Sequence, residues 1–215
     1  MKTPMLRIGS IATAVLLITS CHATTQSAKI IQPGAPGAQS HVIPKEKAVD
    51  LSQVQATKAD IEFMQGMIHH HLQAIDMTNL LAQNTNSEDM RKLGLRMSLS
   101  QSDEIKMMRH WLELRGQEAP GDHAHHMPGA PMMPGMLSPE EMTRLAAAKG
   151  AEFDKLFLEG MIKHHNGALV MVDQLFNTPG AAQQSEIFSF ATDVEADQRA
   201  EIDRMTAMLK ELQNK

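Results

Sequence analysis

Apolar residues recur three and four positions apart along most of the chain beyond residue 56, which is the period of an amphipathic helix. The pattern predicts helices over residues 57–84, 87–116, 138–176 and 181–215, separated by polar turns and by one loop. Gly150 lies within the third stretch, and we expect it to divide that stretch into a short helix and a long one. Because no segment alternates apolar and polar residues, the sequence predicts no β-strand. The fold class expected is all-α.

The predicted helices repeat in pairs. Asp60–Met77 of the first helix returns as Asp154–Met171 of the third, with Asp, Phe, Gly-Met-Ile, His-His, Ala and Met at matching positions. The second and fourth helices share Gln-x-x-Glu-Ile-x-x-Met, which begins at Gln101 and at Gln198. Each half is then a helical hairpin. Two repeated hairpins predict a four-helix bundle, in which side chains from facing helices converge in the interior.

The repeated helices carry histidine and methionine on one face. At about 100° per residue, the His-His pair and the methionines of each motif share one side of the helix, whereas His69 lies on the other side. The second motif has Lys163 where the first has His69, so we expect His69 to face solvent and to bind no metal in the interior. Imidazole nitrogen and thioether sulfur are ligands for soft and borderline metals, copper first among them. The candidate ligands on this face are Met67, His70, His71, Met77, Met161, His164, His165 and Met171.

The same face has a simpler interpretation. Methionine at helical spacing is usually a flexible core residue, and a single buried histidine is more often hydrogen-bonded than bound to metal. Four buried imidazoles are a different case, because each costs free energy unless it finds a partner. Metal ligation supplies that partner, so we interpret the two His-His pairs as ligands.

Residues 117–137 are a predicted loop rich in histidine, methionine, proline and glycine, called here the His/Met loop. We expect it to have no core that its methionines could fill, so its composition indicates a second metal-capture site, separate from the bundle. This site should bind more weakly, because binding must order a flexible segment. The alternative is a low-complexity linker. The candidate ligands in the loop are His123, His125, His126, Met127, Met132, Met133 and Met136.

The first 20 residues predict a secretory signal, because a short basic start precedes an apolar run that is too short to span a membrane. The run ends in Ile-Thr-Ser-Cys21, which resembles a bacterial lipobox and implies cleavage before Cys21 and lipid attachment to it. Cleavage near His22 is the alternative. Residues 21–56 are rich in Pro, Gly and small polar residues and predict a flexible spacer ahead of a domain at 57–215. We expect an exported, periplasmic protein that is anchored to a membrane through lipid.

The amino-acid composition restricts the classes of partner that we expect the protein to bind. The chain has 18 methionines against six phenylalanines, one tryptophan and no tyrosine. Methionine specifies a core less well than phenylalanine or leucine, so this composition also favours sulfur chemistry. The formal net charge of −5 makes nucleic acid a poor partner. One cysteine leaves the chain without an intramolecular disulfide.

The two motifs, Phe-x-x-Gly-Met-Ile-x-His-His-x-x-Ala and Gln-x-x-Glu-Ile-x-x-Met, resemble those of the bacterial family named domain of unknown function 305. The resemblance covers about residues 58–215. It implies a ferritin-like four-helix bundle, and some members are exported copper-binding proteins linked to copper tolerance. Carried over by position, it implies the eight candidate ligands of the helix face, with Met108 and Met205 facing them from the second helices.

Three functions compete. The first is a periplasmic or cell-surface copper-binding protein that sequesters Cu(I), or Cu(II), or hands it to a partner that the sequence does not identify. The second is a di-iron oxidase, but that centre needs Glu-x-x-His on two helices, and no Glu-x-x-His occurs in this sequence. The third is a structural or interaction module whose histidines are merely buried. We favour the first function, and we expect the protein not to be an enzyme.

Overall fold

The computed structural model describes residues 29–32, 39–45, 55–123 and 132–214. The chain divides into two units, Met1–Asp50 and Leu51–Lys215. The expectations for the signal segment, Cys21, His125, His126 and Met127 fall outside the described residues.

The second unit is helical, as the sequence predicted. In chain order its described helices are α2 (Lys58–Asn79), α3 (Leu81–Asn84), α4 (Glu88–Glu113), α5 (Pro139–Ala147), α6 (Gly150–Phe176) and α7 (Ser185–Gln213). None of these helices is both long and apolar enough to cross a membrane, within the part of the chain that the structure describes.

Side chains fix the points at which the helices begin. At α5, the Ser138 hydroxyl accepts a hydrogen bond from the Glu141 amide at 3.2 Å, and the Glu141 carboxylate accepts one from the Ser138 amide at 2.8 Å. This reciprocal capping box satisfies amides that have no partner within the helix. Thr57 and Asp60 form the same arrangement at α2. Gly150, with φ of +59°, begins α6, which confirms the predicted division of the third stretch.

Two helix boundaries differ from the sequence prediction. The first predicted helix is interrupted at Leu80, which ends α2 and precedes the single turn α3. The last helix begins at Ser185 rather than near residue 181. The intervening Ala182 has φ of 54°, and its amide donates to the Asp60 carboxylate at 2.7 Å. A long-range hydrogen bond, which helical periodicity cannot reveal, therefore delays the start of α7.

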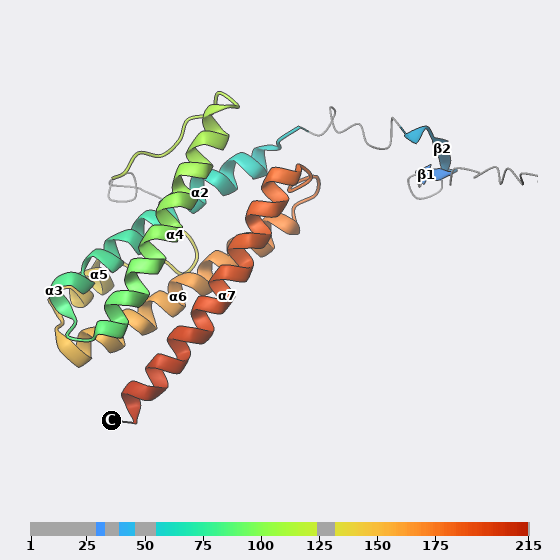
Figure 1. Ribbon diagram of the computed structural model, residues 1–215. Coiled ribbons are helices and arrows are strands. Elements are labelled where there is room, and N and C mark those ends of the chain that lie inside the picture. The colour runs from blue at the N-terminus through green and yellow to red at the C-terminus, as the bar shows by residue number, and fades with distance from the viewer. Residues whose placement is uncertain (1–28, 33–38, 46–54, 124–131, 215) are drawn as a thin grey trace, which may run out of the picture. The chain divides into compact units, whose positions relative to one another are not determined.

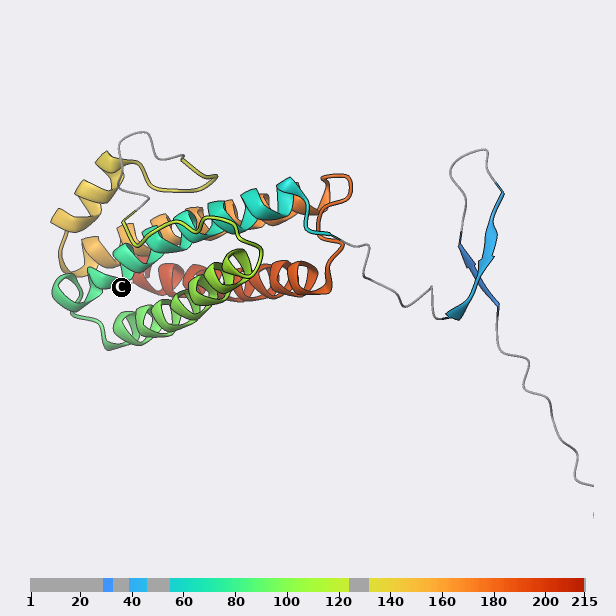
Figure 2. The same ribbon diagram turned by 90° about the horizontal axis from the view of Figure 1, so that it is seen from above.

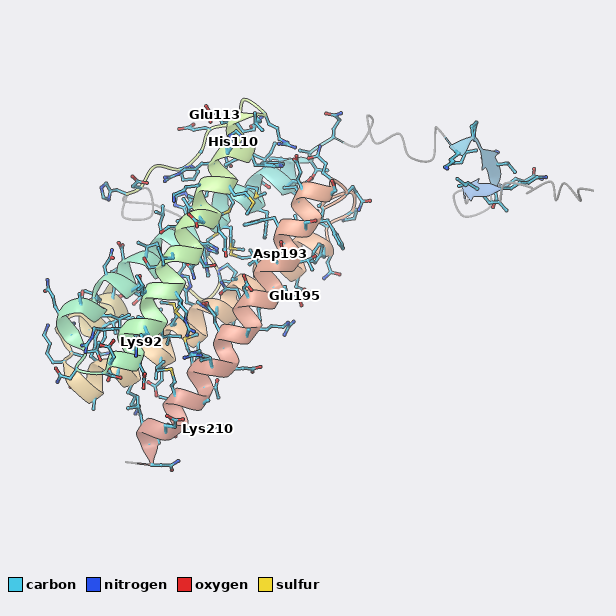
Figure 3. All side chains as sticks on the ribbon, viewed as in Figure 1. Lys92, His110, Glu113, Asp193, Glu195 and Lys210 are labelled. Atoms are coloured by element: carbon cyan, nitrogen blue, oxygen red, sulfur yellow. The ribbon has the colours of Figure 1, made fainter. Side chains whose placement is uncertain are left out.

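The four longest helices form two hairpins. Helix α2 packs against α4, α6 packs against α7, and the hairpins meet where α2 contacts α6 (Figure 1). Figure 2 shows the same unit along another direction, with the short α5 lying beside α6. Sulfur atoms gather between the helices, whereas Lys92 on α4 and Lys210 on α7 extend outward (Figure 3).

The first unit contains two strands, β1 (Ile30–Gln32) and β2 (His41–Ile43), which pair antiparallel with Ile30 opposite Ile43. The expectation that the chain contains no strand is therefore wrong for these residues. Each strand has only three residues, and most of them are exposed. Such short segments bury no face and leave no alternating pattern in the sequence.

Candidate metal centre

Polar side chains cross the middle of the helical unit between two apolar clusters. One cluster contains Phe63 and the other contains Phe153, and each draws residues from α2, α4, α6 and α7. Between them every long helix supplies two buried or half-buried polar residues, which we call the polar layer. Its members are His70 and His71 of α2, Gln101 and Glu104 of α4, His164 and His165 of α6, and Gln198 and Glu201 of α7.

His70 and His164 meet at the contact between the two hairpins. Their ring centroids are 3.7 Å apart, with an angle of 36° between the ring planes. His70 Nε2 lies 3.0 Å from the Pro134 carbonyl oxygen, and His164 Nε2 lies 3.0 Å from the His70 carbonyl oxygen. A carbonyl oxygen can only accept a hydrogen bond, so each Nε2 carries a proton. When the ring is neutral, its Nδ1 atom then presents a lone pair, and neither buried Nδ1 has a hydrogen-bond partner among the residues that the structure describes.

His71 and His165 turn away from this contact toward the outer helices. His71 Nε2 lies 2.5 Å from the Glu104 carboxylate, and His165 Nε2 lies 2.6 Å from the Glu201 carboxylate. Within the described part of the chain, the buried Nδ1 atoms of these two histidines also lack a hydrogen-bond partner. A carboxylate on one ring nitrogen fixes the ring and leaves the other nitrogen for a metal, which is the usual support of a histidine ligand.

Burial keeps two of the four imidazoles neutral. Burial first, and then electrostatic interaction with His71, lowers the pKa of His70 to about 3. Burial first, and then electrostatic interaction with His70, also places the pKa of His164 well below its ordinary value. The Glu104 carboxyl behaves differently, because burial raises its pKa but the hydrogen bond from His71 and other local interactions outweigh this, giving a net lowering. At neutral pH the layer therefore offers the uncharged imidazoles of His70 and His164, together with the ionised carboxylate of Glu104.

The six methionines expected on the inner face are buried, but they do not form a single group. The Phe63 cluster contains Met67, Met108 and Met171, and the Phe153 cluster contains Met77, Met161 and Met205. In the sequence repeat, each methionine of one cluster matches a methionine of the other cluster. One group of three therefore lies on each side of the polar layer. The structure therefore buries the six methionines in two groups, and that they bind metal stays a prediction. Because the matched helices α2 and α6 run antiparallel, thioether sulfur flanks the histidines on both sides.

His69 is half-buried, in contrast to His70 and His71, which are 1% and 0% exposed. The matching Lys163 is exposed and pairs with Glu141 at 2.8 Å. The repeat thus separated the inward histidines from the third one, although His69 is less exposed than expected. That His69 binds no metal in the interior stays a prediction.

The described part of the His/Met loop packs onto the helices. Met132 is 58% exposed, but Met136 is only 5% exposed, and its sulfur accepts a hydrogen bond from the Met133 amide at 3.3 Å. The premise that loop methionines have no core to fill is therefore wrong for Met136. The loop can approach because Gly167 lacks a side chain: a Cβ there would lie 1.9 Å from the Pro134 carbonyl oxygen. The segment lies against α6 rather than apart from it, while His123 is exposed.

The sequence predictions did not include the polar residues that α4 and α7 place next to the histidines. Glu104 and Glu201 hold His71 and His165, and one turn earlier lie Gln101 and Gln198, each 2% exposed. Both pairs stand at matching positions of the Gln-x-x-Glu motif, so the repeat contained a usable signal. Within the described residues no three His, Cys, Asp or Glu side chains are arranged to hold a metal ion. The donors that the layer presents are imidazole Nδ1 atoms, with thioethers on both sides.

These features define a mostly helical protein with two internally repeated hairpins and paired histidines at its centre. The chain belongs to the family described as domain of unknown function (DUF305), whose model matches residues 60–209. A comparison with curated proteins found no match.

Solved structures of the same family resemble this chain. A DUF305 protein from Streptomyces coelicolor, described as secreted, is 26% identical, with a TM-score of 0.62 over 72% of this chain and 93% of that one. A DUF305 fragment from Deinococcus radiodurans is 28% identical, with a TM-score of 0.62 over 73% and 98%. CopM in its Cu(I)-bound form is 27% identical, with a TM-score of 0.56 over 73% and 98%. CopM has also been solved in Cu(II)-bound and Ag-bound forms.

Proposed function

We propose that this protein is an exported copper-binding protein that holds Cu(I), and secondarily Cu(II), at the polar layer and the adjoining methionines. By storing the ion or passing it to another protein, it would contribute to copper tolerance. We also propose that its helical unit is a four-helix bundle of the ferritin-like kind, that it has no catalytic activity, and that Cys21 carries a lipid anchor.

The observation that carries the proposal is the state of the four histidines. Each is 0–1% exposed, each has Nε2 next to an oxygen, and each has an Nδ1 with no hydrogen-bond partner in residues 29–32, 39–45, 55–123 and 132–214. A buried polar atom without a partner costs about 1–3 kcal/mol. Four such atoms at matching positions of a repeat are hard to explain as packing alone. A metal ion bound to them would remove that cost.

The donor chemistry favours copper. Neutral imidazole binds Cu(I) and Cu(II), thioether sulfur favours Cu(I), and no thiolate is required. Burial supports the neutral form of His70 and His164, so a metal need not displace a proton from them at neutral pH. The similarity to CopM, solved with Cu(I), Cu(II) and Ag, supports the same class of ion. A secreted relative supports export.

Metal titration of the helical unit with its adjoining sequence tests the proposal. Cu(I) and Ag(I) should bind in a competition assay against a chromophoric chelator, with the stoichiometry read by native mass spectrometry. Replacing His70 and His71 together with Ala should lower the affinity or the stoichiometry, and so should replacing His164 and His165. His69→Ala is the matched control and should change neither.

Circular dichroism of each variant separates lost ligands from lost folding. If both double variants stay helical and bind Cu(I) as the unaltered protein does, the histidines are structural and the protein is a helical module without a metal function. Binding that depends on His69 as strongly as on the pairs would contradict the assignment of the inner face.

A further inference from the structure

A pocket of about 240 Å³ lies between α2 and α6, where the His/Met loop meets them. Two methionines line it, Met133 from the loop and Met171 from α6. Both converge on Gly66: a Cβ at that position would lie 3.4 Å from the Met133 sulfur and 3.4 Å from the Met171 methyl carbon. Because Gly66 has no side chain, the two thioethers face one small region of α2.

This pocket adjoins the polar layer. Pro134 also lines it, and the Pro134 carbonyl oxygen accepts the hydrogen bond from His70 Nε2. Met171 belongs to the apolar cluster that holds Met67 and Met108. Met133 is half-buried, so the pocket is lined at one point by a partly exposed residue and at another by the residue that holds His70.

The sequence repeat supplies a second pocket for comparison. Gly160 matches Gly66 and Met77 matches Met171, and a pocket of about 210 Å³ surrounds Gly160. A Cβ at Gly160 would lie 3.4 Å from the Met77 methyl carbon and 3.1 Å from a Leu137 methyl carbon. Leu137 therefore stands where Met133 stands in the first pocket. None of the described residues that line the second pocket is a methionine, whereas two methionines line the first.

The charges around the two pockets differ as well. Glu62 is the charged residue among those that line the Gly66 pocket, as far as the structure describes it. The Gly160 pocket is lined by the cations Arg144 and Lys163 together with Glu141 and Glu159. A monovalent cation approaching the Gly66 pocket meets a carboxylate and sulfur, whereas at the Gly160 pocket two positive side chains offset the two carboxylates. Both differences favour the Gly66 pocket.

We propose that Met133 and Met171 form a two-thioether capture site for Cu(I), and for Ag(I) as its chemical analogue, from which the ion passes to the polar layer beside His70. The related pocket at Gly160 does not serve this purpose. The inference rests on the proposed function for the destination of the ion, but the capture site itself is defined by its two sulfurs. Two thioethers without a thiolate suit reversible binding of a soft ion, which a site of transfer requires.

The test is a titration with Ag(I) of the protein labelled with ¹³C in its methionine methyl groups. At substoichiometric Ag(I), the methyl resonances of Met133 and Met171 should shift first and together. Met133→Leu and Met171→Leu each remove one sulfur while nearly conserving volume, so the fold should hold, and each also assigns one resonance. Met107→Leu removes a methionine that is 50% exposed on α4, and it serves as the control.

Uptake kinetics provide the second readout. Even the loss of a group that supports a ligand lowers metal affinity by about 10–100-fold. Weaker capture lowers the occupancy of the site from which the ion is passed on, so transfer of Cu(I) from a chromophoric chelator should be slower in Met133→Leu by at least about tenfold. At the end of the titration, the number of Cu(I) ions bound by Met133→Leu should be lower by no more than the ion that the capture site holds. Met107→Leu should match the unaltered protein in both respects.

The outcomes separate the two proposals. If Met133 and Met171 do not shift at low Ag(I) and neither variant slows uptake, the capture site is refuted, while tight binding that depends on the paired histidines would leave the proposed function intact. If the two methyl groups shift but the His-His double variants bind Cu(I) normally, the capture site stands and the proposed function fails. An equal shift of the exposed Met107 methyl would show unselective sulfur binding and refute the capture site.

Discussion

Gly167 on α6 determines whether the His/Met loop can reach His70. A Cβ at Gly167 would lie 1.9 Å from the Pro134 carbonyl oxygen, whereas ordinary contact begins at 3.4 Å. In Gly167→Ala the oxygen must therefore retreat by about 1.5 Å, because the obstacle is backbone and cannot rotate away. Its 3.0 Å contact with His70 Nε2 would then lengthen beyond hydrogen-bond range.

The size of the effect follows from three contributions. Alanine in place of glycine inside a helix stabilises the fold by about 1 kcal/mol. Losing the partner of a buried N–H costs about 1–3 kcal/mol. Exposing Met136 as the loop lifts costs about 1.5–3 kcal/mol. The losses outweigh the gain, so we expect Gly167→Ala to be less stable by about 1.5–5 kcal/mol.

Urea unfolding followed by circular dichroism measures this change, and the ¹³C-methyl resonance of Met136 reports whether the loop has moved. Gly94→Ala on α4 is a matched control, because its Cβ would lie at the same 1.9 Å but from a Leu81 side-chain methyl. That side chain can rotate, so the cost should be smaller and the Met136 resonance unchanged. If Gly167→Ala is as stable as the unaltered protein and the Met136 resonance does not shift, the close contact does not hold the loop.

Three further outcomes are expected. With metal removed, stability should be greatest above pH 6.5 and should fall as the pH drops toward 3, because His70 and His164 stay neutral in the folded state but protonate when unfolded. Each of the two adds a slope of about 1.4 kcal/mol per pH unit, so His70→Gln should reduce the slope by about half in urea titrations at several pH values. Glu104→Gln should weaken Cu(I) binding by about 10–100-fold, and Glu201→Gln should do the same by symmetry, so competition titrations in which both variants bind normally would show that the carboxylates do not support the ligands. Cys21→Ser should move the protein from the membrane to the soluble fraction, and unchanged partitioning would rule out the lipid anchor.

Much of the helical unit follows from local sequence. Ser138, followed by Pro139 and Glu141, placed the start of α5, because a capping box is formed by residues within one turn of each other. The separation of His70 and His71 from His69 came from the angle between successive residues and from Lys163 in the second motif. Both properties depend only on the geometry of a single helix.

Long-range packing decided the rest. Sequence periodicity could place a methionine on an inner face, but it could not assign Met67 to one cluster and Met77 to the other, because that depends on how antiparallel helices align. It also could not show that the loop packs onto α6 and buries Met136, because that packing requires Gly135 of the loop to meet Gly167 of α6.

The state of the histidines shows the division most clearly. The repeat by itself established that His70 and His164 are equivalent and face inward. Only the tertiary structure supplied the Pro134 carbonyl to one and the His70 carbonyl to the other, and so left both Nδ1 atoms without partners among the described residues. The sequence gives residue type and spacing directly. The hydrogen bonds of His70 and His164, however, join residues 64 and 94 positions apart, so they form only once the hairpins have packed.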